Sequence, residues 1–430
     1  MTQNKSKRLY LGLFVQPLGH HVSGWRLTQN LNLPTDIDWL VQIAQKAETG
    51  RFDLFFVGDA LATSVHRLPS TMARLEPLTL LSALAVNTTK IGLAATASTT
   101  FSDPFTLARA FSSLDHISKG RAAWNVVTSY SQDVAQNFSL QEIPTHTERY
   151  QRAEEFLEVT YKLWDAWQEN AVIANQESGQ YFDNDKIHEV NHHGEHFQVK
   201  GPLNISRSPQ HRPVIIEAGS SNDGQKLAAK TAEVIFTAAA TLEEGQTFYA
   251  SQKQKVIEAG RDPNKVIIMP GVMPIVGKSL ADAQELWNKL NEFVDIDNGL
   301  NQLSARFGID LKQYPLDGPL PEVPIGEGNQ SRVKLLTEQA KRDNLSIRQL
   351  AAIAAGSRGH RVIVGTAKDI ADDLSLWIEK NAADGFNIMP AIIPEQLDLF
   401  IELVIPELKA RGLLPDTYEF ETLRENLGLS

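Results

Sequence analysis

The 430-residue sequence contains no cysteine, which excludes a disulfide framework and any thiol chemistry and fits a cytoplasmic protein. Long apolar runs are also missing. The N-terminal apolar segment 9–15 is too short to be a signal-peptide core or a membrane span. Basic residues are outnumbered by acidic ones: the sequence has 41 Lys and Arg and 52 Asp and Glu, which gives a net charge of −11. No basic cluster offsets this balance, so we expect no nucleic-acid partner.

Short apolar segments alternate with helical patterns along most of the chain. The spacing predicts helices between successive strands and eight strands, at 8–15, 53–57, 90–96, 122–127, 214–218, 234–238, 266–275 and 386–389. Buried parallel strands need crossover helices outside them, so this alternation indicates a (β/α)8 barrel formed by a single domain over 1–430. An open doubly wound sheet is the alternative.

Two stretches interrupt the alternation and are interpreted as insertions into the barrel. The stretch 170–201 is rich in Asn, Asp and Gly, with one short strand-like run at 196–199. The stretch 298–361 is rich in Pro and Gly in its middle. Its glycines between 318 and 328 follow no strand and precede no Lys-Ser or Lys-Thr pair, so they do not form a nucleotide-binding loop.

Polar residues stand where several predicted strands end, which is where a barrel of this kind carries its active site. They are His20 after the first strand, Asp59 after the second, Thr96 at the third, Asn125 in the fourth, and Ser220 and Ser221 after the fifth. Four of them have a simpler interpretation: Asp59 as a turn cap, His20 as a surface loop residue, and either serine as a helix N-cap.

The start of the long helix near position 145 adds two further polar groups. Thr145 and Glu148 have capping-box spacing, which puts the helix start, with free N–H groups and the positive dipole end, beside His146. Tyr150 lies four residues on, on the same helical face. We expect these side chains to meet the indole of Trp124 and the amide of Asn125 at one point, although a solvated first turn explains them equally well.

The hydroxyls of Ser220 and Ser221 indicate a phosphate site. Gly219 before them allows close backbone approach, and the first N–H groups of the next helix point outward.

One further motif is set aside. His188-Glu189-Val190-Asn191-His192 satisfies the zinc-protease pattern, but it lies among Asn, Asp and Gly residues without an apolar helical stripe. We therefore predict no metal site.

Several blocks of this sequence match a known family from end to end. The most specific is Trp124-Asn125-Val126-Val127-Thr128-Ser129. The others are 55–59, 96–98, 113–116, 119–121, 146–150, 201–203, 218–221, 364–366, 384–387 and 406–408. Together they resemble the bacterial-luciferase-like flavin-dependent monooxygenases, in the branch of the nitrilotriacetate, long-chain alkane and dibenzothiophene sulfone enzymes.

The resemblance implies a (β/α)8 barrel that binds reduced FMN at the C-terminal ends of its strands. A separate NAD(P)H:flavin reductase supplies the flavin, and dioxygen gives a flavin hydroperoxide that transfers one oxygen atom to a small organic substrate. Relatives form dimers or tetramers, so a homodimer or homotetramer is expected. The two insertions become lid candidates, because the chemistry needs a dry pocket.

The resemblance also assigns roles to the polar residues. It implies flavin contacts by Asp59, Thr96, His146, Tyr150, Ser220 and Ser221, with Tyr150 and the serines toward the phosphate and Asn125 near the ring. His20 and His360 match the substrate side. We expect His20, His146 and His360 to be the catalytic histidines, hydrogen-bonding the peroxide and managing its proton.

Two positions depart from the family pattern. Glu217 stands where many relatives have Gln, and an extra carboxylate there opposes the anionic reduced ring. The stretch 60–64 lacks the aromatic residue of the alkane and sulfone enzymes, so neither substrate carries over. Hydride transfer by flavin or deazaflavin, and flavin binding without turnover, stay open as alternatives. A flavin-free glycosidase is disfavoured, since no acidic pair follows the strand ends.

Overall fold

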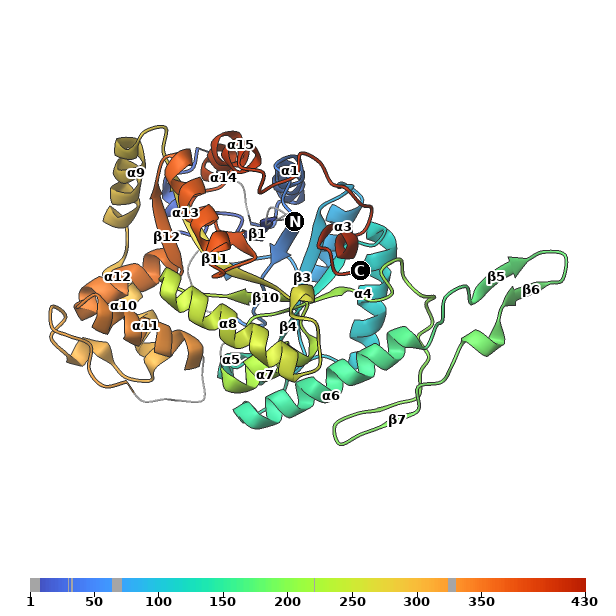
Figure 1. The fold of residues 1–430 in the computed structure, drawn as a ribbon. Coiled ribbons are helices and arrows are strands. Elements are labelled where there is room, and N and C mark those ends of the chain that lie inside the picture. Colours follow the sequence, from blue (N-terminus) through green and yellow to red (C-terminus); the bar gives the residue numbers. More distant parts are fainter. Residues whose placement is uncertain (1–7, 30, 32–33, 64–71, 220, 324–329) are drawn as a thin grey trace.

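A ring of parallel strands lies at the centre of the computed structural model, which describes residues 8–29, 31, 34–63, 72–219, 221–323 and 330–430 (Figure 1). The ring is formed by β1 (Tyr10–Val15), β2 (Leu54–Val57), β3 (Gly92–Ser98), β4 (Ala122–Val127), β9 (Val214–Glu217), β10 (Val234–Thr237), β11 (Ile267–Val276) and β13 (Gly385–Ile388). Each strand pairs in parallel with the next in this order.

The first and last strands of the ring pair with each other, which closes the barrel. The register runs from Tyr10 opposite Gly385 to Leu13 opposite Ile388. Gly12 is required at this seam, because a Cβ atom there would lie 2.1 Å from Oδ1 of Asn387. The closure confirms the predicted barrel and excludes the open sheet.

Helices cover the outside of the barrel and pack against their neighbours around it. They are α1 (Ile37–Thr49), α3 (Pro77–Ala85), α4 (Pro104–Ser118), α6 (His146–Asp165), α7 (Asn222–Thr231), α8 (Leu242–Glu258), α9 (Leu280–Glu292), α13 (Ala367–Glu379), α14 (Glu395–Leu399) and α15 (Ile405–Ala410), with the short α5 (Gln132–Asn137) and α16 (Leu423–Asn426). The predicted capping box of Thr145 and Glu148 starts α6. No helix in the described part of the chain is long and apolar enough to cross a membrane.

A ninth strand, β12 (Arg361–Gly365), was not predicted. It pairs in parallel with the upper half of β11, from Val272 opposite Arg361 to Val276 opposite Gly365. β11 has ten residues and extends past the end of β10, because the last pair between the two strands joins Thr237 of β10 to Pro270 of β11. The backbone groups of β11 after Pro270 therefore need another strand as a hydrogen-bonding partner, and β12 pairs with them.

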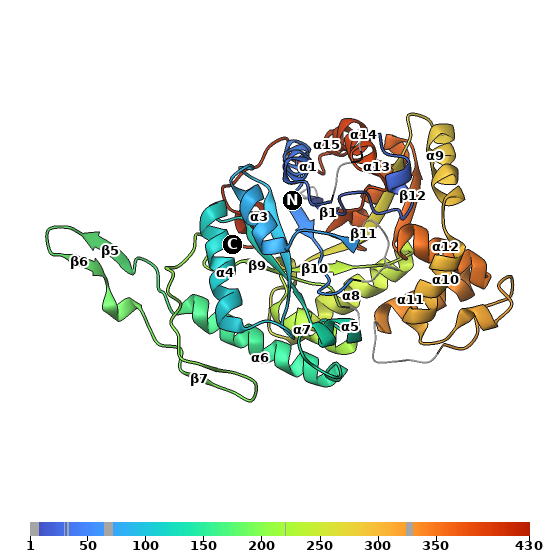
Figure 2. The same cartoon turned by 180° about the vertical axis from the view of Figure 1, so that it is seen from behind.

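The first insertion consists of two small hairpins. One is formed by β5 (Val172–Asn175) and β6 (Gln180–Phe182), and the other by β7 (His192–His193) and β8 (Gln198–Val199). Both views show the β5–β6 hairpin projecting away from the barrel (Figures 1 and 2).

The second insertion is largely helical, which its Pro and Gly content did not predict. It contains α10 (Ile296–Phe307), α11 (Gln330–Arg342) and α12 (Ile347–Ser357). These helices share an apolar cluster of their own that includes Leu300, Leu303, Phe307, Leu336 and Leu350. The cluster makes the insertion a packed unit beside the barrel (Figure 2).

Candidate active site

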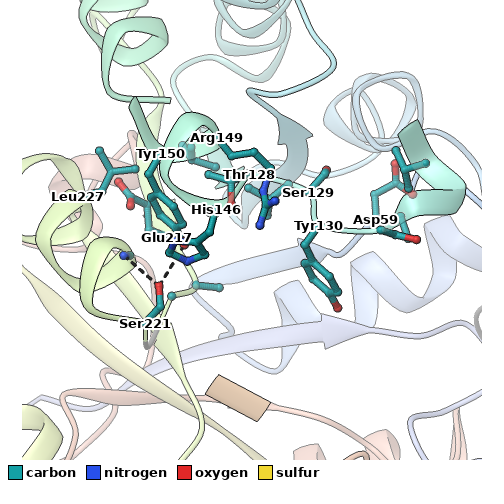
Figure 3. Close-up of a pocket in the computed structure, with 18 of the residues that line it drawn as sticks. Asp59, Thr128, Ser129, Tyr130, His146, Arg149, Tyr150, Glu217, Ser221 and Leu227 are labelled. Atoms are coloured by element: carbon teal, nitrogen blue, oxygen red, sulfur yellow. Dashed lines mark hydrogen bonds between the residues drawn. The ribbon is translucent and has the colours of Figure 1, made fainter. Parts of the chain in front are cut away.

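A cavity of about 340 Å³ opens at the C-terminal ends of β2, β4 and β9. Its lining comes from segments far apart in the sequence: the loop after β2, the loop after β4, the first turn of α6 and the β9–α7 connection. Figure 3 shows Asp59 and Tyr130 at one side of this cavity and His146, Tyr150 and Ser221 at the other. We call it the mouth cavity.

His146 and Tyr150 form the α6 side of the mouth cavity. Their ring centroids are 4.7 Å apart, as expected for two residues one helical turn apart. The Nδ1 atom of His146 lies 3.2 Å from Oδ2 of Asp223 in the first turn of α7. Asp223 therefore restrains the imidazole and links the N-terminal turns of α6 and α7.

Ser221 stands at the N-terminus of α7 and accepts a 3.1 Å hydrogen bond from the Gly224 backbone N–H. It is thus the N-cap, and its hydroxyl also contacts the Tyr150 hydroxyl at 3.4 Å. A Cβ atom on Gly224 would lie 2.9 Å from the Tyr150 hydroxyl oxygen, so only glycine permits this approach. The two interpretations of Ser221, cap and ligand-facing hydroxyl, are therefore compatible.

The same corner has the electrostatic character of an anion site. Helices α6 and α7 both begin there, and the N-terminus of each carries partial positive charge. Hydroxyls of Ser221 and Tyr150 add hydrogen-bond donors. This donor set suits the phosphate of a phosphorylated cofactor.

Asp59 lies at the opposite side of the mouth cavity. Burial raises the pKa of its carboxyl above the usual value, and the Ala60 backbone N–H and the Arg74 guanidinium oppose that rise. Arg74 Nε is 4.0 Å from Asp59 Oδ1. Asp59 is therefore a cavity residue with a cationic neighbour, which its interpretation as a turn cap did not include.

Two predicted residues lie inside the barrel instead. The Thr96 hydroxyl donates to the Val57 carbonyl at 2.8 Å, and the Asn125 amide donates to the Thr96 hydroxyl oxygen at 2.8 Å. Both side chains are buried, and neither is among the described residues that line the mouth cavity. The amide oxygen of Asn125 is buried without a hydrogen-bond partner, so one acceptor of the barrel interior is left unsatisfied.

The expectation that the indole of Trp124 faces the site is wrong. Trp124 precedes Asn125 on β4, and neighbouring strand residues point to opposite faces. Its ring packs in the layer between barrel and helices, against Phe111, Phe156 and Trp164.

The two histidines expected on the substrate side lie around an aromatic cluster above the barrel interior. His20 packs on Phe14, with Nε2 2.6 Å from the Phe14 carbonyl oxygen, while His360 stacks on Phe236. Phe14 and Phe236 touch each other. The four rings thus connect His20 to His360.

His360 and Phe236 line a second cavity of about 790 Å³. It shares Ala218 and Gly219 with the mouth cavity, so the two spaces meet at the end of β9. His360 is therefore near the mouth cavity without lining it. Ser220, between these spaces in the sequence, is outside the described residues.

His20 is neutral at ordinary pH. Burial lowers its pKa well below 6.5, and Arg358 lowers it further. Because the Phe14 carbonyl can only accept, Nε2 of His20 carries the proton and Nδ1 offers a lone pair. This tautomer leaves Nδ1 as an acceptor, but His20 is fully buried and is not among the described residues that line either cavity.

Glu217 is a wall residue of the mouth cavity, on the side of α7. Its carboxyl is buried and hydrogen-bonded to the Thr231 hydroxyl. Burial raises its pKa to about 8, although Thr231 and Arg261 both favour the ionised form. The sequence predicted repulsion between Glu217 and the anionic flavin ring. In the structure, Glu217 lines the mouth cavity together with Ser221 and Gly224, which belong to the anion corner.

Arg149 and Tyr130 line the mouth cavity and were missed from the sequence. Arg149 is buried, and its guanidinium donates to the Pro144 carbonyl at 2.5 Å. The position of Arg149 between His146 and Tyr150 in the sequence was the signal that could have indicated it as a site residue.

The insertions differ in their relation to the site. Residues of α11, including Lys334 and Arg342, line the second cavity, whereas the described residues of 170–201 line neither cavity. The lid prediction is thus wrong for the first insertion, because its hairpin points away from the barrel (Figure 1). The HExxH tract there is not helical: His188 contacts Gln168, and His192 contacts Glu155.

Residues 17–379 match the family described as luciferase-like monooxygenase. The chain belongs to that family. N-acetyl-S-(2-succino)cysteine monooxygenase of Bacillus subtilis (strain 168) is 50% identical over 433 residues, covering 99% of this chain and 98% of the relative. Nitrilotriacetate monooxygenase component A of Aminobacter aminovorans is 44% identical over 440 residues, covering 99% and 97%.

A solved structure of a similar protein supports the same assignment. A long-chain alkane monooxygenase superposes with a TM-score of 0.86 at 32% identity, covering 99% of this chain and 96% of that one. These findings confirm the family and the branch that the sequence blocks predicted. The chain is therefore a flavin-dependent monooxygenase of the luciferase-like family.

Proposed function

We propose that this chain is the oxygenating component of a two-component system, receiving reduced FMN from a separate NAD(P)H:flavin reductase and inserting one oxygen atom of O2 into a small organic substrate. The supporting observation is convergence: Asp59, His146, Tyr150 and Ser221 come from four separate segments and line one cavity. Family membership makes that cavity the natural flavin site.

The residues of the mouth cavity fit FMN at both ends. The glycines at 219 and 224 leave room beside the Tyr150 hydroxyl, where the helix N-termini and Ser221 would hold the phosphate. Asp59 would hold the ring end, and the buried, unpartnered amide oxygen of Asn125 would accept a hydrogen bond from it. Reduced FMN bound there would supply the electrons that activate dioxygen for oxygen-atom transfer.

The histidines of this chain would manage the proton that the reaction moves. His146 is positioned by Asp223, and His20 presents a lone pair at Nδ1. His360 lines the second cavity, next to the shared wall at Gly219. The second insertion borders that cavity through α11, which would exclude water during turnover.

We further propose a substrate that carries carboxylate groups. The relatives at 50% and 44% identity are named for N-acetyl-S-(2-succino)cysteine and nitrilotriacetate, which both carry carboxylates. In this chain Lys334 and Arg342 line the second cavity, each beside a glutamate of the same lining, at 3.8 Å from Glu338 and 2.6 Å from Glu244. The relatives' names therefore carry this proposal, and they indicate a carboxylated thioether or tertiary amine.

The experiment is a substrate screen with a flavin reductase, NADH and FMN, comparing carboxylated thioethers and amines with uncharged sulfur compounds and alkanes. We expect a product heavier by one oxygen atom, or its breakdown products, from a carboxylated member only. Oxidation of NADH that yields hydrogen peroxide alone with every compound would contradict the proposed oxygenation. Product from an uncharged compound would contradict only the substrate class.

A further inference from the structure

The hydroxyl of Thr231 contacts two oxygen atoms, although it has a single proton to donate. It lies 2.7 Å from the Leu227 carbonyl oxygen and is also hydrogen-bonded to the Glu217 carboxyl. Both oxygen atoms are acceptors, so the single Thr231 proton is shared between the Leu227 carbonyl and the Glu217 carboxyl. An ionised Glu217 carboxylate therefore receives only part of one hydrogen bond, whereas a protonated carboxyl would donate to the Thr231 hydroxyl oxygen and leave the Thr231 proton for Leu227.

The surroundings of Glu217 favour that neutral form. Its strand neighbours are apolar, Val126 on β4 and Ile235 on β10. Tyr161 of α6 interacts with Glu217 from the helical side, and burial raises the pKa of its phenol too. The guanidinium of Arg261, after α8, donates hydrogen bonds to the carbonyl oxygens of Ala229 and Ala232.

The groups facing Glu217 from the mouth cavity have a different character. His146, Arg149 and Tyr150 of α6 and the N-terminal turn of α7 line the same space as its side chain. Asp59 lies at the far side of that space (Figure 3). A carboxylate in this wall would act on any anion held at the Ser221 corner through a medium of low dielectric, where repulsion is strong.

We infer that Glu217 is a proton-dependent determinant of cofactor binding, a carboxylic acid that must keep its proton for a phosphorylated flavin to occupy the mouth cavity. This inference rests on the proposed function and deepens it. A protonated Glu has the hydrogen-bond donor and acceptor that a Gln would offer at this position. The difference is that Glu can ionise, so this chain loses FMN as the pH rises and a Gln-bearing chain does not.

The test is an anaerobic titration of photoreduced FMN and reduced riboflavin into the wild-type protein and Glu217→Gln at pH 7 and pH 9. For the wild type we expect the Kd for FMN to rise roughly tenfold between these pH values, the limit for one linked proton with a pKa in that interval. Glu217→Gln should show a much smaller rise. Riboflavin, which lacks the phosphate, should show little difference between the two proteins.

The outcomes separate this inference from the proposed function. Tight FMN binding with the same pH dependence in both proteins would overturn the inference and leave the function standing. No flavin binding by either protein at any pH would overturn both. An infrared carbonyl band of a protonated acid, present in the wild type at pH 6.5 and missing in Glu217→Gln, is expected, and finding no such difference would also overturn the inference.

Discussion

His146 and Asp223 join the first turns of two helices, with 3.2 Å between Nδ1 of the imidazole and Oδ2 of the carboxylate. The pair sets the orientation of the imidazole, which packs at a tilt against the Tyr150 ring in the mouth cavity. Neither residue is close to the other in sequence, and only the packing of α6 beside α7 brings them together. The geometry makes Asp223 a positioning residue for His146.

The first prediction concerns this pair. His146→Ala should reduce the fraction of oxidised flavin that yields product, because the imidazole that we propose handles the proton is lost. Asp223→Asn should lower that fraction less, since it keeps the ring but loosens its orientation. Product formed per NADH consumed measures the effect, with peroxide release as the complement. Equal coupling in His146→Ala and the wild type would remove His146 from the catalytic residues.

A second prediction addresses the anion corner. Ser221→Ala with Tyr150→Phe should weaken binding of reduced FMN by about 1–3 kcal/mol, the scale of lost hydrogen bonds to a charged group. Anaerobic titration gives the Kd. The matched control is Ser279→Ala, which removes the N-cap hydroxyl of α9 away from both cavities. If the control weakens FMN binding as much as the double variant, loss of a helix cap explains the result.

Substitution of Gly224 should separate flavin affinity from stability. A Cβ atom at this position would lie 2.9 Å from the Tyr150 hydroxyl oxygen and 3.1 Å from Oγ of Ser221. Ala is a better helix former than Gly by about 1 kcal/mol, which offsets part of the clash. We expect Gly224→Ala to keep its melting temperature within a few degrees while FMN affinity falls. Unchanged affinity would place the phosphate elsewhere.

The buried acid also makes a stability prediction, independent of any ligand. The pKa of Glu217 is about 8 in the folded protein against 4.5 in an exposed chain. Between these values the folded state holds a proton that the unfolded state lacks, so the free energy of unfolding falls as pH rises. The slope is about 1.4 kcal/mol per pH unit.

Denaturant unfolding at several pH values measures this difference. We expect Glu217→Gln to gain stability over the wild type progressively from pH 5 to pH 7.5, and the gap to level off above pH 8. A constant gap over that range would show that Glu217 does not carry a raised pKa.

His20 should remain neutral throughout the working range of the enzyme. Its lowered pKa means that the unfolded chain binds a proton below pH 6.5 while the folded one does not, so stability falls as the pH drops below that value. Nitrogen-15 NMR should show an Nε2–H tautomer that does not titrate between pH 6 and pH 9.

Much of the architecture follows from local patterns that the sequence displays. The apolar runs at 122–127 and 214–218 are β4 and β9, with the latter one residue shorter at its C-terminal end, and the capping box at Thr145 starts α6. β12 was missed although residues 362–364 form a β-branched run, because this run is short and directly follows the stretch interpreted as an insertion. The upper edge of β11 creates the need for it.

The sequence by itself determined the alternation of strands and helices, the starts of α6 and α7, and the family blocks at the strand ends, since each depends on residues within a turn or two of one another. The tertiary structure alone decided which of those polar residues share a cavity. Closure of the barrel turned Thr96 and Asn125 inward and Trp124 outward. It also set Glu217 against Thr231, because burial and partner choice depend on elements that meet only when the ring of strands is complete.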